Sequence, residues 1–427
     1  MEISSCLYQL GLFDDVTSDA INLLLEEEKN AHLLLLNRRS RSSVACIHPT
    51  EDISWDRINW DRARRIGEYG SFTQEYRMPA VSFDILLEKL RPKITPDPRI
   101  SSGKTKRGAL LAEHVLAFTL RYLGGASYHE LKKVYGMKKT NLYHWIHKCI
   151  QAINEDPTLE FSLPTDRVKL AELAAGFRVY SKDGLFSGCV GALDGWLCVI
   201  RCPRESETPS PIRYYSGHYG VHGVNVQAVC DSFSRFTYAS IMFPGATNDL
   251  EAFEGSSLFG IHQQFPWGFY LLADNAYTLS DRLLVPFFGS QRGHVSHDAF
   301  NFYLSQLRIK IEQAFGLLVT KWRILRAALE VALHNVTPLI FACMRLHNFV
   351  ITERIKQTGA TMVDFGSEID NWSPEVDLGY LPVHCEENTH SGYSFVREKM
   401  VQHILEAGRV RPAQVPRKKS KKLRVQY

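Results

Sequence analysis

The hydrophobic period of the chain changes near residue 186, and this change constrains the fold more than any other feature. From about Val81 to Ile153 the apolar residues recur every three or four positions, as on the buried face of a helix. Beyond the change, short runs of β-branched and aromatic residues are bounded by turn formers, which predicts strands. One long helix is then expected at about Ser305 to Leu325. This order predicts a mixed α/β layer architecture preceded by an all-α region.

The pattern divides the 427 residues into four expected segments. They are an N-terminal extension of unknown role at 1–80, a helical region at 81–155, an α/β domain at 186–352, and an acidic linker with a basic tail at 353–427. In the first segment a helical pattern runs from Ser18 to Leu36, and in the last Asp364–Glu387 holds seven acidic residues and no Lys or Arg.

The net charge of +4 comes largely from the tail, because Arg409–Arg424 holds eight basic residues and the rest therefore nets 4 − 8 = −4. Its "RKKSKK" run, Arg417–Lys422, predicts a nuclear-import signal or a phosphate-binding arm, or else a disordered solubilising tail. Nine cysteines without a CxxC pair indicate reduced thiols in a nuclear or cytosolic protein. No apolar run approaches the roughly 18 to 20 residues that a membrane span needs, so no membrane association is expected.

Two consecutive helices are expected within 127–153. "SYHELKKVYG" begins with a capping-box pair, Ser127 and Glu130, and Gly136 turns the chain before a second amphipathic stretch. The pair has the shape of a helix-turn-helix, and its polar face carries donors suited to phosphates and base edges. These donors are Lys138, Lys139, Asn141, His144, His147 and Lys148. Periodicity alone equally allows a plain three-helix bundle with a solvated basic face.

Two predicted strands each end on an aspartate. "GCVGALDGWLCVI" (188–200) meets Asp194, and "GFYLLADNAY" (268–277) meets Asp274. Glu312 follows Ile311 on the buried stripe of the long helix. If the three carboxylates converge, they repel one another unless cations neutralise them, and their hard oxygens select Mg²⁺ or Mn²⁺. Position alone also allows strand-end turn aspartates and a helix-surface glutamate.

A spacing of Cys198, Cys202, His218 and His222 superficially fits a zinc finger. The histidines lead into a strand, however, and no recognition helix starts between the two pairs. A structural zinc site is therefore not expected.

Six ordered stretches resemble the catalytic domain of PIF/Harbinger-type transposases, which carry a DDE carboxylate triad on an RNase H-like fold. They are "GALDGW" at 191–196, "GVNVQAVCD" at 223–231, "FPGATND" at 243–249, "LLADNAY" at 271–277, "LRIKIEQAFGLLVTKWRIL" at 307–325 and "ACMRLHNFV" at 342–350. The separations agree as well: 80 positions from Asp194 to Asp274, and 38 from Asp274 to Glu312, close to the family's second interval. The helices upstream resemble the family's DNA-binding helices.

The resemblance implies roles for individual residues. Asp194 would bridge two Mg²⁺ (or Mn²⁺) ions, while Asp274 and Glu312 would each bind one of them. Asp249, in "GATND", would be a supporting residue close to the site. "ADNAY" stands where the family commonly has Gly-Asp-Ser-Gly-Tyr, so the ligand Asp274 is retained but the following turn lacks glycine freedom.

The resemblance also implies a function: a nuclear transposase or transposase-derived endonuclease that cleaves and joins DNA phosphodiesters by a two-metal mechanism. Its DNA would be the element's terminal repeats, and its partners a Myb-like DNA-binding protein and further copies of the chain, in a homodimer or larger assembly. On the long helix Arg308, Lys321 and Arg323 would hold DNA phosphates or form a solvated face. The alternative is a domesticated, non-catalytic DNA-binding or scaffold protein that retains the fold.

Overall fold

The computed structural model describes residues 57–61, 64, 72–97, 109–288, 293–358 and 393–412. Apart from Pro412, these residues belong to one compact unit, Ser54–Arg411. Three of the features expected from sequence lie outside the described residues: the helical pattern at 18–36, the acidic segment at 364–387 and the basic run at 417–422.

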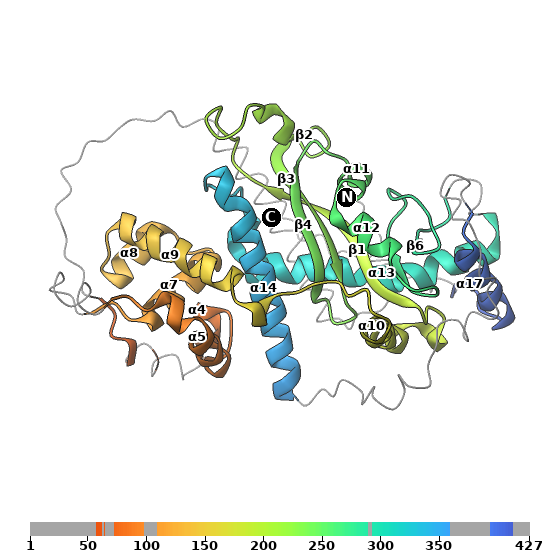
Figure 1. Ribbon diagram of the computed structural model, residues 1–427, viewed down its shortest axis with the longest axis horizontal. Helices are drawn as coiled ribbons and strands as arrows, with labels where there is room; N and C mark the ends of the chain where they lie inside the picture. Colours follow the sequence, from red (N-terminus) through yellow and green to blue (C-terminus); the bar gives the residue numbers. More distant parts are fainter. Residues whose placement is uncertain are drawn as a thin grey trace, which may run out of the picture. The chain divides into compact units, whose positions relative to one another are not determined.

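A mixed sheet forms the centre of the α/β part (Figure 1). Its strands are β1 (Cys189–Val199), β2 (Tyr215–Ser216), β3 (Val221–Cys230), β4 (Phe236–Pro244), β5 (Tyr270–Leu272) and β6 (Leu283–Leu284). Strand β3 pairs antiparallel with β1, β2 and β4, whereas β5 lies parallel between β1 and β6. The change of period near residue 186 therefore marks the entry into a sheet, as predicted.

The central strands are buried because their sequences are apolar on both faces. Strand β1 is completely buried from Cys189 to Leu193, and β3 from Gly223 to Cys230. Runs of this kind are typical of strands covered on both sides rather than on one. Polar side chains inside them, such as Gln227, therefore need hydrogen-bond partners within the protein.

Helix α13 (Val295–Lys321) runs crosswise to the strands and packs against β1, β3 and β5 (Figure 1). It begins ten residues earlier than the expected Ser305, because Ala299, Phe300, Tyr303 and Leu304 extend its buried stripe. It ends at Lys321, where the backbone of the fully buried Trp322 leaves helical geometry and a short 3₁₀-helix, η7 (Arg323–Arg326), follows.

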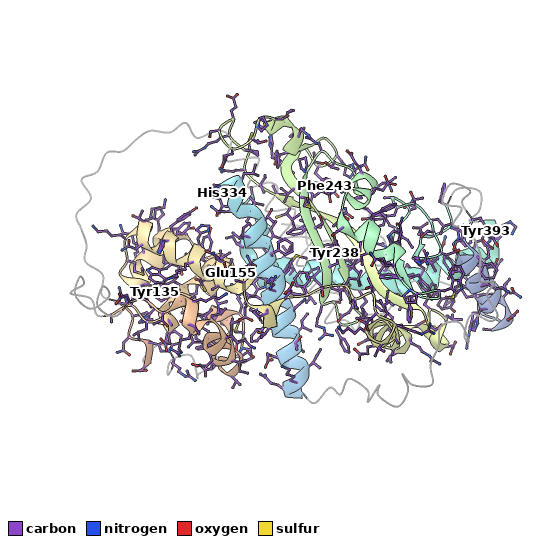
Figure 2. The ribbon with its side chains drawn as sticks, viewed as in Figure 1. Tyr135, Glu155, Tyr238, Phe243, His334 and Tyr393 are labelled. Atoms are coloured by element: carbon purple, nitrogen blue, oxygen red, sulfur yellow. The ribbon has the colours of Figure 1, made fainter. Side chains whose placement is uncertain are left out.

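The helical part is a bundle whose core is rich in aromatic rings. Its helices are α4 (Phe72–Tyr76), α5 (Ala80–Ile94), α7 (Ala112–Leu123), α8 (Tyr128–Tyr135) and α9 (Lys139–Asn154). Tyr135 lies inside this bundle, 5.4 Å from the ring of Phe118 (Figure 2). Trp60 stacks on Phe83 at 5.2 Å, so residues before 81 belong to the same core and the expected boundary at 80 is placed too late.

Only half of the expected capping box forms at the start of α8. Ser127 Oγ accepts a hydrogen bond from the Glu130 amide at 3.1 Å. The Glu130 carboxylate instead accepts one from Arg121 at 2.7 Å, which ties α8 to α7. Gly136 ends the helix with a left-handed backbone (φ 55°), as its position predicts.

Helix α14 (Leu333–Thr358) lies between the helical bundle and the sheet, packing on α9 and on β4 (Figure 1). Asn154 donates to the carbonyl of Pro338 at 2.8 Å, and Arg345 donates to the carbonyl of Asp156 at 3.3 Å. The bundle and the sheet are thus joined by side-chain hydrogen bonds to main-chain oxygens as well as by apolar packing.

Two helices occur where the sequence reading placed none. Helix α10 (Arg167–Tyr180), in the stretch between the two expected domains, packs on β1, and its N-cap Asp166 accepts from the amide of Lys169 at 3.0 Å. Helix α17 (Phe395–Glu406), within the supposed linker and tail, packs on α13 through Val396, Met400, Val401 and Ile404. Helix α14 also continues past 352, the expected end of the α/β domain. No described helix is long and apolar enough to cross a membrane.

The turn from β3 to β4 depends on one buried carboxylate, and its position near Asp231 is as predicted. Asp231 Oδ1 accepts from the amides of Phe233 and Arg235, both at 2.9 Å, while its Oδ2 pairs with the Arg235 guanidinium at 2.7 Å. These bonds hold Ser234 at φ 61°, a left-handed conformation that residues with a side chain rarely adopt.

We expect Asp231→Ala to lower the free energy of unfolding by about 3 kcal/mol, because it leaves a partly buried guanidinium without its partner. Asp231→Asn keeps an oxygen for the two amides and should lose about half as much. Urea denaturation followed by tryptophan fluorescence measures both changes. Equal losses in the two variants would show that the amide bonds do not hold the turn.

Candidate active site

The parallel pairing of β1 and β5 brings Asp194, which lies in the middle of β1 rather than at its predicted end, towards Asp274, which follows β5. Ala192 lies beside Leu272 in the register. Asp194 and Asp274 each follow two residues later in the chain. Their side chains lie on the same face, because side chains alternate along a strand. Asp194 remains within β1, opposite Ala228 of β3, whereas Asp274 begins the turn after β5. Its Oδ1 accepts a hydrogen bond from the Ala276 amide at 2.9 Å.

Helix α13 brings the third carboxylate to the same place through an arginine. The Arg308 guanidinium lies 3.2 Å from Asp194 Oδ2 and 2.5 Å from Glu312 Oε1. All three side chains are largely buried, with exposed fractions of 18% for Arg308, 21% for Asp194 and 17% for Glu312. Since Arg308 and Glu312 are four residues apart on one helix face, a single cation bridges the helix and the strand.

Burial raises the pKa of Asp194 to about 7 from the ordinary 3.8. Arg308 and the Gly195 amide oppose this rise, whereas the negative charges of Asp274 and Glu312 add to it. Both other carboxylates therefore act on Asp194 electrostatically, which places the three within one site. The net shift means that one guanidinium does not fully offset the burial and repulsion of the ionised carboxylate.

Asp249 lies against strand β1 at Gly195, the residue that follows Asp194. Its Oδ1 accepts hydrogen bonds from Gln227 Nε2 at 2.9 Å and from Asn225 Nδ2 at 3.0 Å, both on β3. A Cβ built on Gly195 would stand 2.1 Å from that oxygen, so only glycine fits beside the aspartate. Asp249 is the first residue of the short helix α11 (Asp249–Glu254), which it ties to the sheet next to the site.

The same polar chain anchors the segment that carries Asp274. The buried hydroxyl of Tyr277 donates to Gln227 Oε1 at 2.7 Å, and the amide group of Gln227 donates onward to Asn225 Oδ1 at 2.8 Å and to Asp249. Tyr277 is three residues after Asp274. A tyrosine thus fixes the turn that lacks the glycines common in the resembling family.

The expected DNA-contacting residues of α9 fall into two groups. Lys138, Lys139, Asn141 and His144 are exposed at the start of the helix, as a binding face requires. Lys148 is half-buried, with its ammonium 4.7 Å from the centre of the Trp145 ring, and His147 lies 4.1 Å from the Tyr143 ring.

The three cations expected on the long helix are not equivalent. Arg308 lies between the carboxylates rather than on an outer face. Lys321 is half-buried and donates to the carbonyl of Arg77 at 3.2 Å, near the helical bundle. Arg323 follows the end of α13 and is exposed. The sequence analysis did not predict that Arg308 pairs with Glu312. Their spacing of four residues on one helix is the signal that could have indicated this pair.

The carboxylate oxygens are donors of the kind that hard divalent cations prefer, and two of the carboxylates already pair with a positive charge. In the described ranges, no group of three or more His, Cys, Asp or Glu residues is arranged to hold a metal ion. The zinc-like spacing is not assembled either: Cys198 is fully buried in β1, whereas Cys202 is exposed.

Comparison with known protein families gives a match to part of the chain. Residues 193–348 match the sequence model of the DDE superfamily endonucleases. The match begins one residue before Asp194 and contains Asp274, Glu312 and Asp249. It supports a transposase-like nuclease domain, of a superfamily whose members act on DNA and generally use divalent metal ions. Neither the curated proteins nor the solved structures gave a match to the chain.

In the region that matches the DDE endonucleases, the raised pKa of Asp194 makes its ionised form destabilising. The unfolded chain ionises near pH 3.8 and the folded one near pH 7, so this group's contribution to stability falls as the pH rises between those values. We expect Asp194→Asn to raise the melting temperature of the metal-free protein by about a few degrees at pH 8. The gain should shrink as the pH falls through 7 towards 5.

Thermal denaturation in EDTA across this pH range measures the effect, with Glu172→Gln, an exposed site on α10, as the control. A gain independent of pH would contradict an ionised, destabilising Asp194. A loss of stability at pH 8 would show that its bond to Arg308 outweighs burial.

Proposed function

We propose that the chain is a DNA transposase or transposase-derived endonuclease of the PIF/Harbinger type, with an RNase H-like catalytic domain. The observation that carries this proposal is the convergence of Asp194, Asp274 and Glu312 from two parallel strands and one helix. It combines with the match of residues 193–348 to DDE endonucleases. Phosphodiester cleavage needs charge neutralisation at the reacting phosphate, and a carboxylate cluster at a sheet edge supplies it by holding cations.

Asp194, Asp274 and Glu312 would hold two Mg²⁺ or Mn²⁺ ions, with Asp194 as the ligand shared by both. The bound ions would stabilise both the attacking and the leaving oxygen of an in-line displacement. The chain's own contribution is to fix the carboxylates. Gly195 leaves room for Asp249, which receives two β3 amides, and Tyr277 locks the turn after Asp274 to Gln227.

Arg308 would have two positions in this scheme. Without metal it neutralises Asp194 and Glu312. When cations take these carboxylates, the guanidinium would turn towards the DNA, because its planar donor pair matches a phosphate as well as it matches a carboxylate. Once cations occupy the carboxylates, Arg308 would therefore hold the DNA strand beside the site.

The helix pair α8 and α9 is proposed to bind double-stranded DNA as a helix-turn-helix. The exposed start of α9, with Lys138, Lys139, Asn141 and His144, is the part that would enter a major groove. Lys148 would contribute through its position beside Trp145. The substrate would be the terminal repeats of the element, bound in the nucleus by a homodimer or larger assembly together with a Myb-like partner.

Cleavage of DNA from the flanks of the protein's own gene tests the proposal. We expect Mg²⁺- or Mn²⁺-dependent strand cleavage that falls at least about a thousandfold in Asp194→Asn, Asp274→Asn and Glu312→Gln, as expected when charge stabilisation is removed. Glu172→Gln should cleave normally, and all variants should bind DNA. Undiminished cleavage in Asp194→Asn would remove these carboxylates from the mechanism.

One observation favours the second candidate, a domesticated non-catalytic DNA-binding or scaffold protein. The Arg308 guanidinium pairs with both Asp194 and Glu312, so these carboxylates have a counter-charge that is part of the chain itself. A chain of this kind would bind DNA but show no metal-dependent cleavage on any substrate. The cleavage assay above separates the two candidates.

The metal affinity of the site tests the position of Arg308. We expect Arg308→Gln to bind Mn²⁺ about tenfold more tightly, because no internal cation then competes for the carboxylates; a tenfold change corresponds to about 1.4 kcal/mol. Lys310→Gln removes an equal charge from the same helix, where the ammonium lies over the Tyr180 ring, and should change affinity much less. Calorimetric titration of the two variants with Mn²⁺ compares them, and equal affinities would rule out direct competition.

A further inference from the structure

A concentration of positive charge lies where α13 ends beside the helical bundle. Five cationic side chains from four segments meet there, and we call them the junction cluster: Arg77, Lys321, Arg323, Arg326 and Arg354. They come from the loop after α4, the end of α13, the 3₁₀-helix η7 and the C-terminal half of α14. None of the five belongs to the carboxylate site described above.

Close contacts hold the cluster together. Lys321 Nζ donates to the carbonyl of Arg77 at 3.2 Å, and Arg77 donates from its guanidinium to the carbonyl of Gly124 at 3.0 Å. A Cβ on Gly124 would stand 2.9 Å from Arg77 Nε, and one on Gly125 would stand 3.1 Å from Arg323 Cβ. The Gly124–Gly125 turn, with Gly125 at φ 100°, therefore lets two arginines approach the same stretch of backbone.

The cluster works against stability as it stands. The pKa of Lys321 is lowered to about 8 by burial and by the charges of Arg354 and Arg77. The pKa of Arg77 is lowered by burial and by Arg323 and Arg326. Arg77 also has a left-handed backbone, φ 63°, and a buried Nε without a hydrogen-bond partner. Mutual repulsion of cations and backbone strain at one place are typical of a functional site.

We propose that the junction cluster binds the backbone phosphates of duplex DNA. Arginine donors in a partly dehydrated setting suit phosphate oxygens, and several cations along one surface match the repeating charge of a nucleic-acid strand. Arg323 and Arg354 are exposed and form the accessible part of the cluster. The contact holds the DNA between the helices of the bundle and the domain with the carboxylates. Because it involves phosphates and not base edges, it gives affinity without sequence preference.

Salt dependence of DNA binding tests the proposal in the full-length protein. Anisotropy of a labelled duplex is measured in EDTA, where cleavage is impossible, so the outcome is independent of whether the chain is a nuclease. Each lost phosphate contact reduces the slope of log affinity against log salt by about 0.9, which corresponds to about 3.5-fold over a fourfold change in salt. We expect that reduction in Arg323→Gln, which keeps the Cβ packed on Gly125, and not in Arg323→Lys.

Lys399→Gln is the matched control. Lys399 lies on α17, which packs near the other end of α13, where Arg411 pairs with Asp298 at 3.0 Å. The 27-residue α13 separates the two places by about 40 Å. An unchanged slope in Arg323→Gln, or an equal reduction in Lys399→Gln, would overturn the proposal.

Thermal denaturation in phosphate and in chloride at equal ionic strength distinguishes DNA from a free anion. Phosphate should raise the melting temperature of the protein and not that of Arg323→Gln, since the ligand stabilises only the form that binds it. A phosphate effect lost in Arg323→Gln, combined with an unchanged DNA salt slope, would assign the cluster to a free phosphate compound and overturn the DNA assignment.

Discussion

Strand β1 is the element on which the remaining structure depends, because its two neighbours run in opposite senses. On one side the antiparallel β3 supplies the amides that hold Asp249. On the other side the parallel β5 delivers Asp274 to the same sheet edge. A register shift of one residue would turn Asp194 to the opposite face, away from Glu312 and Arg308. The full burial of β1 from Cys189 to Leu193 opposes such a shift.

Charge balance is the second organising constraint. The site pairs one guanidinium with two of its three carboxylates, and in the junction cluster burial and neighbouring cations lower the pKa of Arg77 and of Lys321. Each group of charges lowers the stability of the protein when no ligand is bound, and the two groups have charges of opposite sign. A nucleic-acid strand with bound divalent ions carries both complementary charges. One ligand assembly would therefore relieve both places at once.

Much of the fold follows from local patterns in the sequence. The two buried strands, the β3–β4 turn at Asp231 and the helices around Gly136 are each marked by a few adjacent residues, and each occurs where it was predicted. Helices α10 and α17 were not predicted, because α10 lies in a polar stretch taken for a linker and α17 follows an acidic segment. The contact of Arg308 with Asp194 and the Tyr277 anchor could not be predicted, since both join segments whose proximity only the folded sheet creates.

The contrast between Gly195 and Asp194 bears on the history of the chain. Gly195 is held by packing, because any side chain there would collide with Asp249 whether or not the protein cuts DNA. Asp194 is the reverse: its ionised form opposes folding, so substitutions that remove the charge would be favoured by stability alone. In a lineage released from selection for cleavage, drift would erase the aspartate well before the glycine beside it. If the chain cleaves DNA as proposed, selection on cleavage would keep the aspartate, whereas packing alone would keep the glycine.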